Sequence, residues 1–392
     1  MQGLKHLEYR GYDSAGIAVV KNKEIEIVKS VGEIKKLESA LSAKDYSKVQ
    51  TAVGHTRWAT HGAPSTINSH PHPDCKGTLG LVHNGIIENY MQLKNALIAE
   101  GHVFKSQTDT EVASHLIEKH YSGDALAALQ KALQEIRGSY AFAFVHRDYP
   151  DKIFFARCQS PLIVGLGKGM NLIASDVPAV LAYTRKVIYL EDGDYGYISK
   201  DGFEIYNSGL KVERKISEVS WSVEDAQKGG FPHFMLKEIF ENPRAISETL
   251  LSRISLSPPY SSLDLPEEVL RSAKRFHIVA CGTSYHAGLV GKHAIEPISG
   301  TPVQVDVASE QRYSFIDDDE VFVYITQSGE TADTLACARE AKRRGKTTIA
   351  ITNVVGSTIT RECTYSIMMC AGPEKGVAAT KTYTSQIVTL YV

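Results

Sequence analysis

The hydrophobic pattern of this chain changes character near its middle, and this change limits the folds that the chain can adopt. In the first part, short apolar runs come in pairs around tight turns, as Gly16 to Val20 and Glu24 to Val28 do, which is typical of antiparallel strands. In the second part, single apolar runs alternate with helical stretches. A chain of 392 residues is also too long for one ordinary core. We therefore expect two domains of different class, at 1–212 and 251–392, joined by a linker and a connecting helix at 213–250.

The first domain combines strand pairs with helices. We expect residues 153–157 to pair with residues 162–166 as another antiparallel pair. Thr108-x-x-Glu111 is a capping-box pattern that predicts the start of a helix. A further helix, with leucines at helical spacing, should end at Gly138 before the next strand. Sheets and helical layers together predict an α+β domain.

The second domain shows four apolar runs that predict buried strands separated by helices. These runs are 276–280, 321–326, 347–352 and 365–370. Regular alternation of strand and helix predicts an α/β domain with a parallel, doubly wound sheet. Such sheets bind ligands at the carboxyl ends of their strands.

Charge and composition exclude several classes of partner. The formal net charge is −2, so the chain has no electrostatic preference for nucleic acid or for an anionic membrane. No run approaches the roughly 18 apolar residues of a membrane helix, and the first residues do not resemble a signal peptide. Six cysteines without CxxC spacing indicate reduced thiols. We expect a cytoplasmic protein whose partners are small molecules.

Two strand-to-helix junctions in the second domain are rich in hydroxyl groups. Strand 276–280 runs into Cys281-Gly282-Thr283-Ser284, and strand 321–326 runs into Thr326-Gln327-Ser328-Gly329-Glu330-Thr331. The free N–H groups and the dipole of a helix N-terminus favour a phosphate, and the hydroxyls add donors. At a single junction these residues could be helix caps only. Neither loop has the GxxxxGK[ST] or GxGxxG pattern, which disfavours a nucleotide.

In the first domain, the segments around Arg57 and Asn84 combine many residues of the buried type with reactive ones. An arginine among aromatic and small residues suits a bidentate grip on a carboxylate. Asn84-Gly85 offers a side-chain amide beside a backbone N–H, the two donors of an oxyanion hole. The alternatives are a tight turn at Asn84-Gly85, a salt-bridged surface Arg57 and a core Trp58.

A metal is a weaker possibility at His70, His72 and Cys75. Their spacing could support zinc, but no fourth ligand is evident in the sequence and the prolines indicate a rigid loop. We therefore expect no metal there. Asp109, similarly, could be only a first-turn acid that the helix dipole favours.

The second domain resembles the sugar isomerase (SIS) domains that bind phosphosugars. The segments that carry the resemblance are CGTSYHAG, the SEQR at 309–312 and TQSGETADTL. The segment 376–381, GVAATK, resembles the GVASTK stretch of the family, with Ala379 where a serine is common. The resemblance implies that the sugar phosphate is bound by Thr283, Ser284, Thr326, Gln327, Ser328, Thr331 and Val377.

The first domain resembles class II glutamine amidotransferases, which have the αββα fold of the N-terminal nucleophile type. HTRWATHG, HNGIIEN and TDTEV carry this resemblance, and EYRGYDSAG points to the hexosamine-forming branch. By this resemblance Arg57 binds the α-carboxylate of glutamine and Asp109 its α-amino group. Asn84 and Gly85 stabilise the tetrahedral oxyanion. The remaining pocket residues implied are Thr60 and His61, with Trp58 gating the ammonia path.

Together the two resemblances indicate the fructose-6-phosphate aminotransferase family. The family converts L-glutamine and D-fructose 6-phosphate to L-glutamate and D-glucosamine 6-phosphate, for UDP-N-acetylglucosamine synthesis, without a cofactor and as a homodimer. Its nucleophile is an N-terminal cysteine on a strand expected before Met1, and a second SIS domain is expected after Val392. We therefore expect the chain alone to be inactive. The alternatives are a non-catalytic phosphosugar-binding module and a phosphoribosyl-transferring amidotransferase, which the hydroxyl-rich TQSGETADT loop disfavours.

Overall fold

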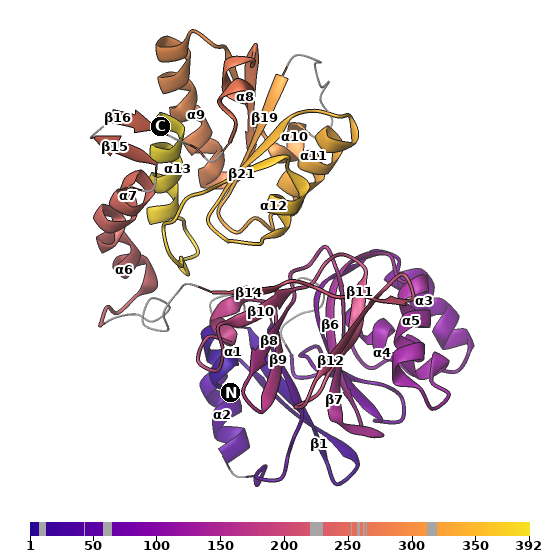
Figure 1. Cartoon of the computed structure of the whole chain (residues 1–392). Helices are drawn as coiled ribbons and strands as arrows, with labels where there is room; N and C mark the ends of the chain where they lie inside the picture. Colours follow the sequence, from indigo (N-terminus) through magenta and orange to yellow (C-terminus); the bar gives the residue numbers. More distant parts are fainter. Residues whose placement is uncertain are drawn as a thin grey trace. The chain divides into compact units, whose positions relative to one another are not determined.

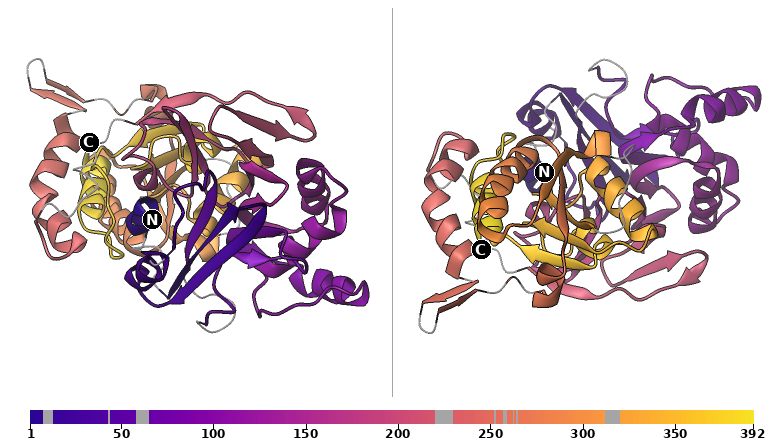
Figure 2. Two further views of the ribbon diagram at one scale, coloured as in Figure 1. Left: turned by 90° about the horizontal axis from the view of Figure 1, so that it is seen from below. Right: turned by 90° about the horizontal axis from the view of Figure 1, so that it is seen from above.

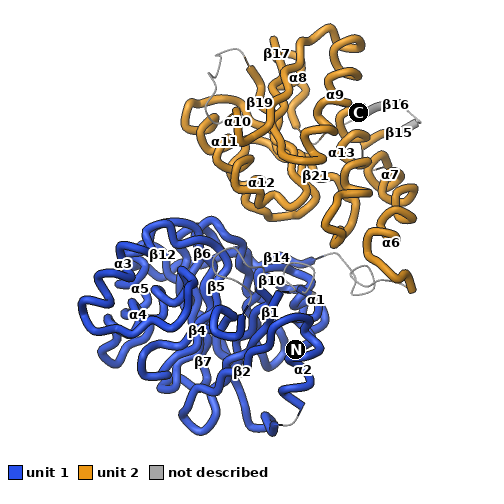
Figure 3. The backbone as a smooth tube through the Cα atoms, turned by 180° about the vertical axis from the view of Figure 1, so that it is seen from behind, with its two compact units in different colours: residues 1–220 blue, residues 221–392 orange. Residues whose placement is uncertain are grey.

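The computed structural model divides the chain into two compact units, Met1–Ser220 and Trp221–Val392 (Figure 3). It describes residues 1–7, 13–42, 44–57, 65–219, 230–251, 253–256, 259–261, 263, 265–311 and 320–392. No helix in these ranges is both long enough and apolar enough to cross a bilayer. Each unit has its own buried core, so each is described by itself.

Unit 1 contains three antiparallel sheets. The first has the order β2-β1-β3, the second β14-β10-β8-β9 and the third β13-β12-β11-β7-β6-β5-β4. The strands of the first sheet are β1 (Ser14–Lys21), β2 (Glu24–Val31) and β3 (Ala52–Arg57). Those of the second are β8 (Ile163–Gly167), β9 (Met170–Ala174), β10 (Lys186–Tyr189) and β14 (Ile216–Glu218). Those of the third are β4 (His72–Pro73), β5 (Leu79–Ile87), β6 (Gly138–His146), β7 (Tyr149–Cys158), β11 (Asp194–Ile198), β12 (Phe203–Asn207) and β13 (Leu210–Lys211).

Helices cover the outer faces of these sheets. On one side lie α3 (Tyr90–Ala99), α4 (Thr110–His120) and α5 (Ala125–Glu135) (Figures 1 and 2). Elsewhere lie α1 (Gln2–Leu7), α2 (Ile34–Ser42) and the 3-10 helix η2 (Val177–Ala179). One core joins α4 and α5 to the seven-stranded sheet through Leu116, Leu129 and Phe142, and another joins that sheet to β1 and β3 through Ala18 and Val53. The layers are therefore αββα, which confirms the predicted fold of the first domain.

Two details of the first domain differ from the prediction. Residues 153–157 do not pair with 162–166, because β7 pairs with β6 and β11, whereas β8 pairs with β9 and β10. Phe155 and Val164 instead share a core between the two sheets. Thr108 is not the cap of α4: the cap position is Asp109, and Glu111 accepts hydrogen bonds from Lys105 N and Ser106 N.

Unit 2 is built on a five-stranded sheet with the order β18-β17-β19-β20-β21, in which every pair is parallel. The strands are β17 (Arg275–Ala280), β18 (Val303–Val307), β19 (Glu320–Thr326), β20 (Thr348–Thr352) and β21 (Tyr365–Met368). The sequence predicted four of them, and the edge strand β18 was missed. This sheet confirms the predicted doubly wound α/β fold.

Helices pack on both faces of this sheet (Figure 1). Val279 and Tyr324 pack on one face with Leu335 of α11, while Ile278 packs on the other with Leu390 of α13. The helices are α6 (Phe234–Phe240), α7 (Asn242–Leu251), α8 (Glu267–Arg271), α9 (Gly282–Ser299), α10 (Ala308–Gln311), α11 (Ala332–Arg343), α12 (Thr358–Glu362) and α13 (Lys381–Tyr391). A short hairpin of β15 (Ile254–Leu256) and β16 (Pro259–Ser261) follows α7.

Candidate active site and sugar-phosphate site

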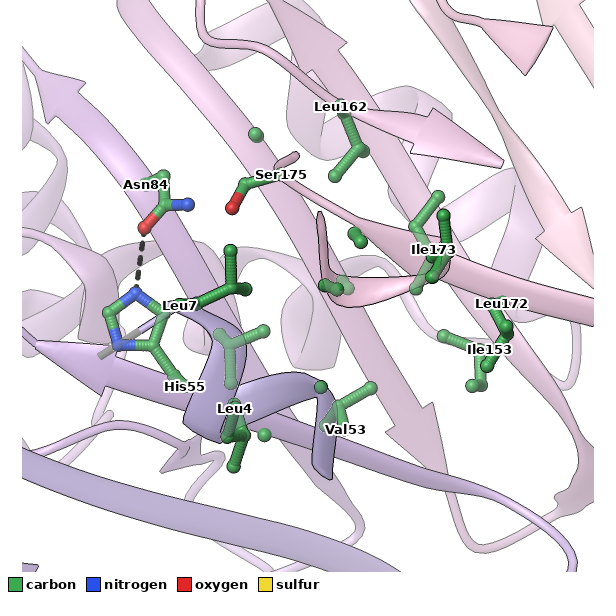
Figure 4. Close-up of a pocket in the computed structure, with 18 of the residues that line it drawn as sticks. Leu4, Leu7, Val53, His55, Asn84, Ile153, Leu162, Leu172, Ile173 and Ser175 are labelled. Carbon is green, nitrogen blue, oxygen red and sulfur yellow. Dashed lines mark hydrogen bonds between the residues drawn. The ribbon is translucent and has the colours of Figure 1, made fainter. Parts of the chain in front are cut away.

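A cavity of about 560 Å³ in unit 1 has one polar end. Figure 4 shows His55 of β3 and Asn84 of β5 at that end, with Leu4, Ile173 and other apolar side chains around the rest. His55 Nε2 lies 2.8 Å from Asn84 Oδ1. The hydrogen bond holds the amide so that its NH₂ group points away from His55 (Figure 4). Asn84 therefore keeps N–H donors for a ligand in the cavity.

His55 Nε2 donates this hydrogen bond because Asn84 Oδ1 can only accept, and burial keeps the ring neutral. Burial lowers the pKa of His55 to about 4, although the contact with Asn84 acts in the opposite direction. The ring also stacks on His70 at a centroid distance of 4.3 Å. A neutral, stacked imidazole fixes the orientation of Asn84 without adding charge to the cavity. The sequence analysis did not single out His55, whose role depends on the pairing of segments that lie far apart in the chain.

Gly85 follows Asn84 in a conformation that requires glycine. Its φ is +133°, and a Cβ atom there would lie 2.1 Å from the carbonyl oxygen of Ser139 on β6. The residue is paired with Tyr140 inside a continuous ladder, so Asn84-Gly85 is part of a strand and not the tight turn considered as the alternative. The strand places the Asn84 amide and the Gly85 N–H next to each other, as an oxyanion hole requires.

Arg57 and Asp109 are both buried, with 4% and 5% of their surface exposed. Burial lowers the pKa of Arg57, whereas the carboxylates of Asp13 and Asp109 act to raise it. Asp109 makes no capping hydrogen bond within α4, and its Oδ2 instead accepts a hydrogen bond of 2.8 Å from Ile87 N. Arg57 is therefore not the surface residue considered as an alternative, whereas Asp109 does stand at the N-cap of α4, where the helix dipole favours an acid. The two opposite charges near β5 suit an amino acid zwitterion.

Three residues named with Arg57 cannot be placed. Trp58, Thr60 and His61 lie outside the described residues, as do residues 8–12 of the EYRGYDSAG segment.

The histidines considered as metal ligands do not gather with Cys75. His70 stacks on His55, and its Nδ1 accepts a hydrogen bond of 3.2 Å from His83 N. Cys75 lies instead with His102, His115 and Glu118, a group that the sequence analysis did not recognise.

The second cavity, of about 180 Å³, lies at the switch point of the parallel sheet. Successive connections leave β17 toward opposite sides, because β18 lies on one side of β17 and β19 on the other. Ala280 pairs with Ile325, so the loops that follow these two strands begin side by side. Doubly wound sheets bind ligands at this kind of position.

All seven residues predicted to bind the sugar phosphate line this cavity. They are Thr283, Ser284, Thr326, Gln327, Ser328, Thr331 and Val377. Thr326 Oγ1 lies 2.9 Å from Thr331 Oγ1 and accepts a hydrogen bond from Gly329 N, and Ser328 Oγ accepts one from Glu330 N. Ser284 Oγ accepts a hydrogen bond of 3.0 Å from Gln386 of α13. The loop after β19 thus orients its own hydroxyls, whereas α13 orients Ser284, and the cavity lies at the N-termini of α9 and α11.

Two glutamates that no sequence pattern indicated fix the segment around Gly376: Glu374, which is partly buried, and Glu238, which is buried. Glu374 lines the cavity and accepts hydrogen bonds from Thr380 N and Thr382 N. Glu238 of α6 accepts hydrogen bonds from Lys375 N and Gly376 N, and a Cβ atom on Gly376 would lie 2.6 Å from its Oε2. No local pattern marks these glutamates. Glu238 accepts hydrogen bonds from a segment that is distant in sequence, and Glu374 accepts them at irregular spacing.

Comparison with known proteins defines the class of this chain. Residues 55–182 match the family described as "Glutamine amidotransferase domain", and residues 269–392 match the family described as "SIS domain". The chain therefore contains a glutamine amidotransferase domain and a SIS domain.

Proteins of one name are similar to this chain along its whole length. The glutamine--fructose-6-phosphate aminotransferase of Caldanaerobacter subterraneus subsp. tengcongensis is 50% identical over 397 residues, which cover 100% of this chain and 65% of that protein. The enzyme of the same name from Clostridium tetani is 48% identical with the same coverage. A solved structure of the C-terminal domain of glucosamine-fructose-6-phosphate aminotransferase from Francisella tularensis is 43% identical, covers 42% of this chain and 47% of that chain, and has a TM-score of 0.40. The chain is thus similar to glutamine--fructose-6-phosphate aminotransferases and spans about 65% of the length of these curated relatives.

Proposed function

We propose that this chain carries the glutamine-binding and fructose 6-phosphate-binding parts of an enzyme that forms D-glucosamine 6-phosphate. Glutamine would be the nitrogen donor in unit 1, and the sugar phosphate the acceptor in unit 2. The observation that carries the proposal is the gathering of seven polar and loop residues, from three separate segments, around one cavity at the switch point. Whole-chain similarity to aminotransferases of this name supports it.

The amidotransferase part of the proposal rests on the geometry around β5. Asn84 and Gly85 would stabilise the oxyanion formed when the glutamine amide is attacked, an effect worth about 3 kcal/mol per donor in enzymes of this type of chemistry. Arg57 would bind the α-carboxylate and Asp109 the α-amino group. Glutamine binding by Thr60, His61 and Trp58 stays a prediction, since these residues are not described.

A second candidate is a phosphosugar-binding module that does not release ammonia. The hydroxyl-lined cavity of unit 2 is lined by residues of that unit and would serve such a module without glutamine chemistry. The two candidates share the sugar-phosphate site and differ in glutamine chemistry.

Two measurements on the full chain test the proposal. The first is calorimetric titration with fructose 6-phosphate, with fructose as the matched ligand that lacks the phosphate. We expect binding of the phosphate ester alone, weakened at least tenfold in Ser328→Ala and unchanged in Ser299→Ala, a serine at the far end of α9. Absence of binding in the unsubstituted chain would overturn both candidates.

The second measurement is glutamate release from glutamine by the chain and by a version extended upstream to the N-terminal cysteine that the resemblance implies, each with and without fructose 6-phosphate. Release by the extended version would support the aminotransferase. Sugar-phosphate binding without release from either version would favour the binding module. Assembly as a homodimer and a cytoplasmic location remain predictions from the family resemblance and the sequence.

A further inference from the structure

Four potential metal ligands converge on the outer side of unit 1, apart from both cavities. They are Cys75, His102, His115 and Glu118, and their ligand atoms all lie within 4.8 Å of one another. Cys75 follows β4, His102 follows α3, and His115 and Glu118 lie three residues apart on α4. Three segments that are distant in sequence therefore place four ligand atoms close together. Two of these atoms come from α4.

The distances between these atoms match the edges of a zinc tetrahedron. Cys75 Sγ lies 3.6 Å from His102 Nδ1 and 3.4 Å from His115 Nδ1. Glu118 Oε2 lies 3.2 Å from His102 Nδ1 and 3.3 Å from His115 Nδ1. Ordinary zinc bond lengths at tetrahedral angles give about 3.5 Å between sulfur and nitrogen and about 3.3 Å between nitrogen and oxygen. All four measured edges agree with these values to about 0.1 Å.

Hydrogen bonding alone does not account for this arrangement. Each Nδ1 atom faces both the sulfur and the carboxylate oxygen, which gives four contacts. One ring nitrogen has a single in-plane site, so it either donates one hydrogen bond or accepts one. At most two of the four contacts can then be hydrogen bonds, whereas one cation at the centre satisfies all four.

Neighbouring groups limit the positions of the ligands. His115 Nε2 lies 3.6 Å from Glu111 Oε1, so a carboxylate lies near the ring nitrogen that faces away from the cluster, at a distance longer than a hydrogen bond. Val103 N donates a hydrogen bond to Cys75 Sγ at 3.3 Å, which fixes the position of the sulfur. The side chains of His115 and Glu118 are 1% and 6% exposed, while Cys75 is exposed and leaves a path for an ion to enter.

We propose that Cys75, His102, His115 and Glu118 bind one zinc ion with a structural role. Four protein ligands fill a tetrahedral site and leave no position for substrate or water. The ion would fix α4 to the turn after β4 and to the turn after α3. Because α4 begins beside Asp109 and its Glu111 holds Ser106, the ion would stabilise the loop at 105–109, which is proposed to meet the glutamine amino group.

The experiment uses the full chain without a histidine tag. Metal-free protein is titrated with Co²⁺, whose absorption reports both a thiolate ligand and tetrahedral geometry. We expect a sulfur-to-cobalt charge-transfer band and intense visible bands that saturate at about one ion per chain and disappear when zinc is added. If cobalt produces no thiolate band in the unsubstituted protein, the zinc site does not exist and the cluster is only a polar contact.

Matched variants locate the ion. Cys75→Ser and His102→Gln should lower the zinc content at least tenfold, measured by mass spectrometry of the purified protein. Cys370→Ser removes another exposed thiol, and His120→Gln removes a histidine of the same helix that contacts Glu135, so both should retain zinc. A chelator should lower the melting temperature of unit 1 in the unsubstituted protein and in both controls. Equal zinc content in Cys75→Ser and Cys370→Ser would overturn the assignment.

Discussion

Gly85 occupies a position on β5 where a side chain has no room. Its φ of +133° is reached almost only by glycine, and the carbonyl of Ser139 lies 2.1 Å from where a Cβ would be. We predict that Gly85→Ala destabilises unit 1 by more than about 3 kcal/mol, because strain and a backbone clash add. Denaturant unfolding followed by circular dichroism measures the change.

Gly77→Ala is the matched control for this prediction. Gly77 also has a positive φ, of +64°, but nothing lies within 4 Å of an added Cβ. That substitution should cost only about 1 kcal/mol, the ordinary penalty of a left-handed residue. Equal costs at the two glycines would show that the contact with Ser139 is unimportant.

The buried histidines of unit 1 should make it sensitive to mild acid. Burial lowers the pKa of His55 to about 4 and that of His72 to about 3, below the value of about 6.5 in the unfolded chain. The unfolded state therefore binds more protons, so stability is complete above pH 6.5 and is lost as the pH falls toward the folded pKa values. We expect His55 alone to remove about 2 kcal/mol between pH 7 and pH 5.

Urea unfolding of the chain at several pH values measures this loss. His55→Gln should reduce the dependence of the unfolding free energy on pH between pH 7 and pH 5. His120→Gln, which replaces a histidine with a partly exposed side chain, should not. A slope that is the same in all three proteins would contradict the role assigned to His55.

The residues predicted to bind the sugar phosphate were found most easily where they lie within one segment. Residues 326–331 end one strand and form the loop after it, so strand position, hydroxyl content and the family resemblance all pointed to them, and those predicted to bind the ligand line one cavity. His115 and Glu238 were missed because each contacts a residue 40 or more positions away, which no local pattern reports. Spacing in sequence also suggested the wrong partners for Cys75, since two nearby histidines face the interior and two distant ones face the thiol.

At the scale of elements, α6 supports the sugar-phosphate cavity through Glu238. This side chain is 1% exposed, burial raises its pKa, and it accepts the N–H groups of Lys375 and Gly376. Glu238→Ala would leave these buried donors without a partner, which costs about 1–3 kcal/mol. We predict that Glu238→Ala lowers the stability by this amount and also weakens fructose 6-phosphate binding. Calorimetry measures both effects.

Glu248→Ala on α7 is the control. Its carboxylate lies 3.5 Å from Arg244 on the surface, with a side chain 47% exposed, so removing it should cost less than about 0.5 kcal/mol. If both variants bind the sugar phosphate as the unsubstituted chain does, α6 has no part in shaping the cavity.

Elements were predictable where the local pattern decides the structure. The apolar runs of β17, β19 and β20 are buried on both faces and were found, whereas β18 at the edge of the sheet has an alternating pattern with exposed Gln304 and was missed. The false pairing of 153–157 with 162–166 has a related cause. Both segments are strands close in sequence, but sheet membership depends on which other strands compete for the same edge.

At the scale of the whole molecule, the two units should respond separately to ligand. Each has its own core and one of the two cavities, so we expect two calorimetric unfolding transitions. Fructose 6-phosphate at 100 times its Kd should raise only the transition of unit 2, by roughly 5–10 °C. At the same ligand concentration Ser328→Ala should reduce the shift by about half or more, because a tenfold weaker Kd lowers the stabilisation from about 2.7 to about 1.4 kcal/mol. A shift of both transitions would mean that the units unfold as one cooperative block.

The lining of the unit 2 cavity also affects how strongly ligand affinity depends on salt concentration. No lysine or arginine is among the described residues that line it. A ligand dianion would be held by hydrogen bonds from hydroxyl and N–H groups inside the cavity, and partly buried interactions of this kind are screened less by dissolved ions than those between exposed charges. Its affinity should therefore change far less with salt concentration than that of a phosphate site built from lysine and arginine, and discrimination among ligands would come from fit and hydrogen-bond count instead of total charge.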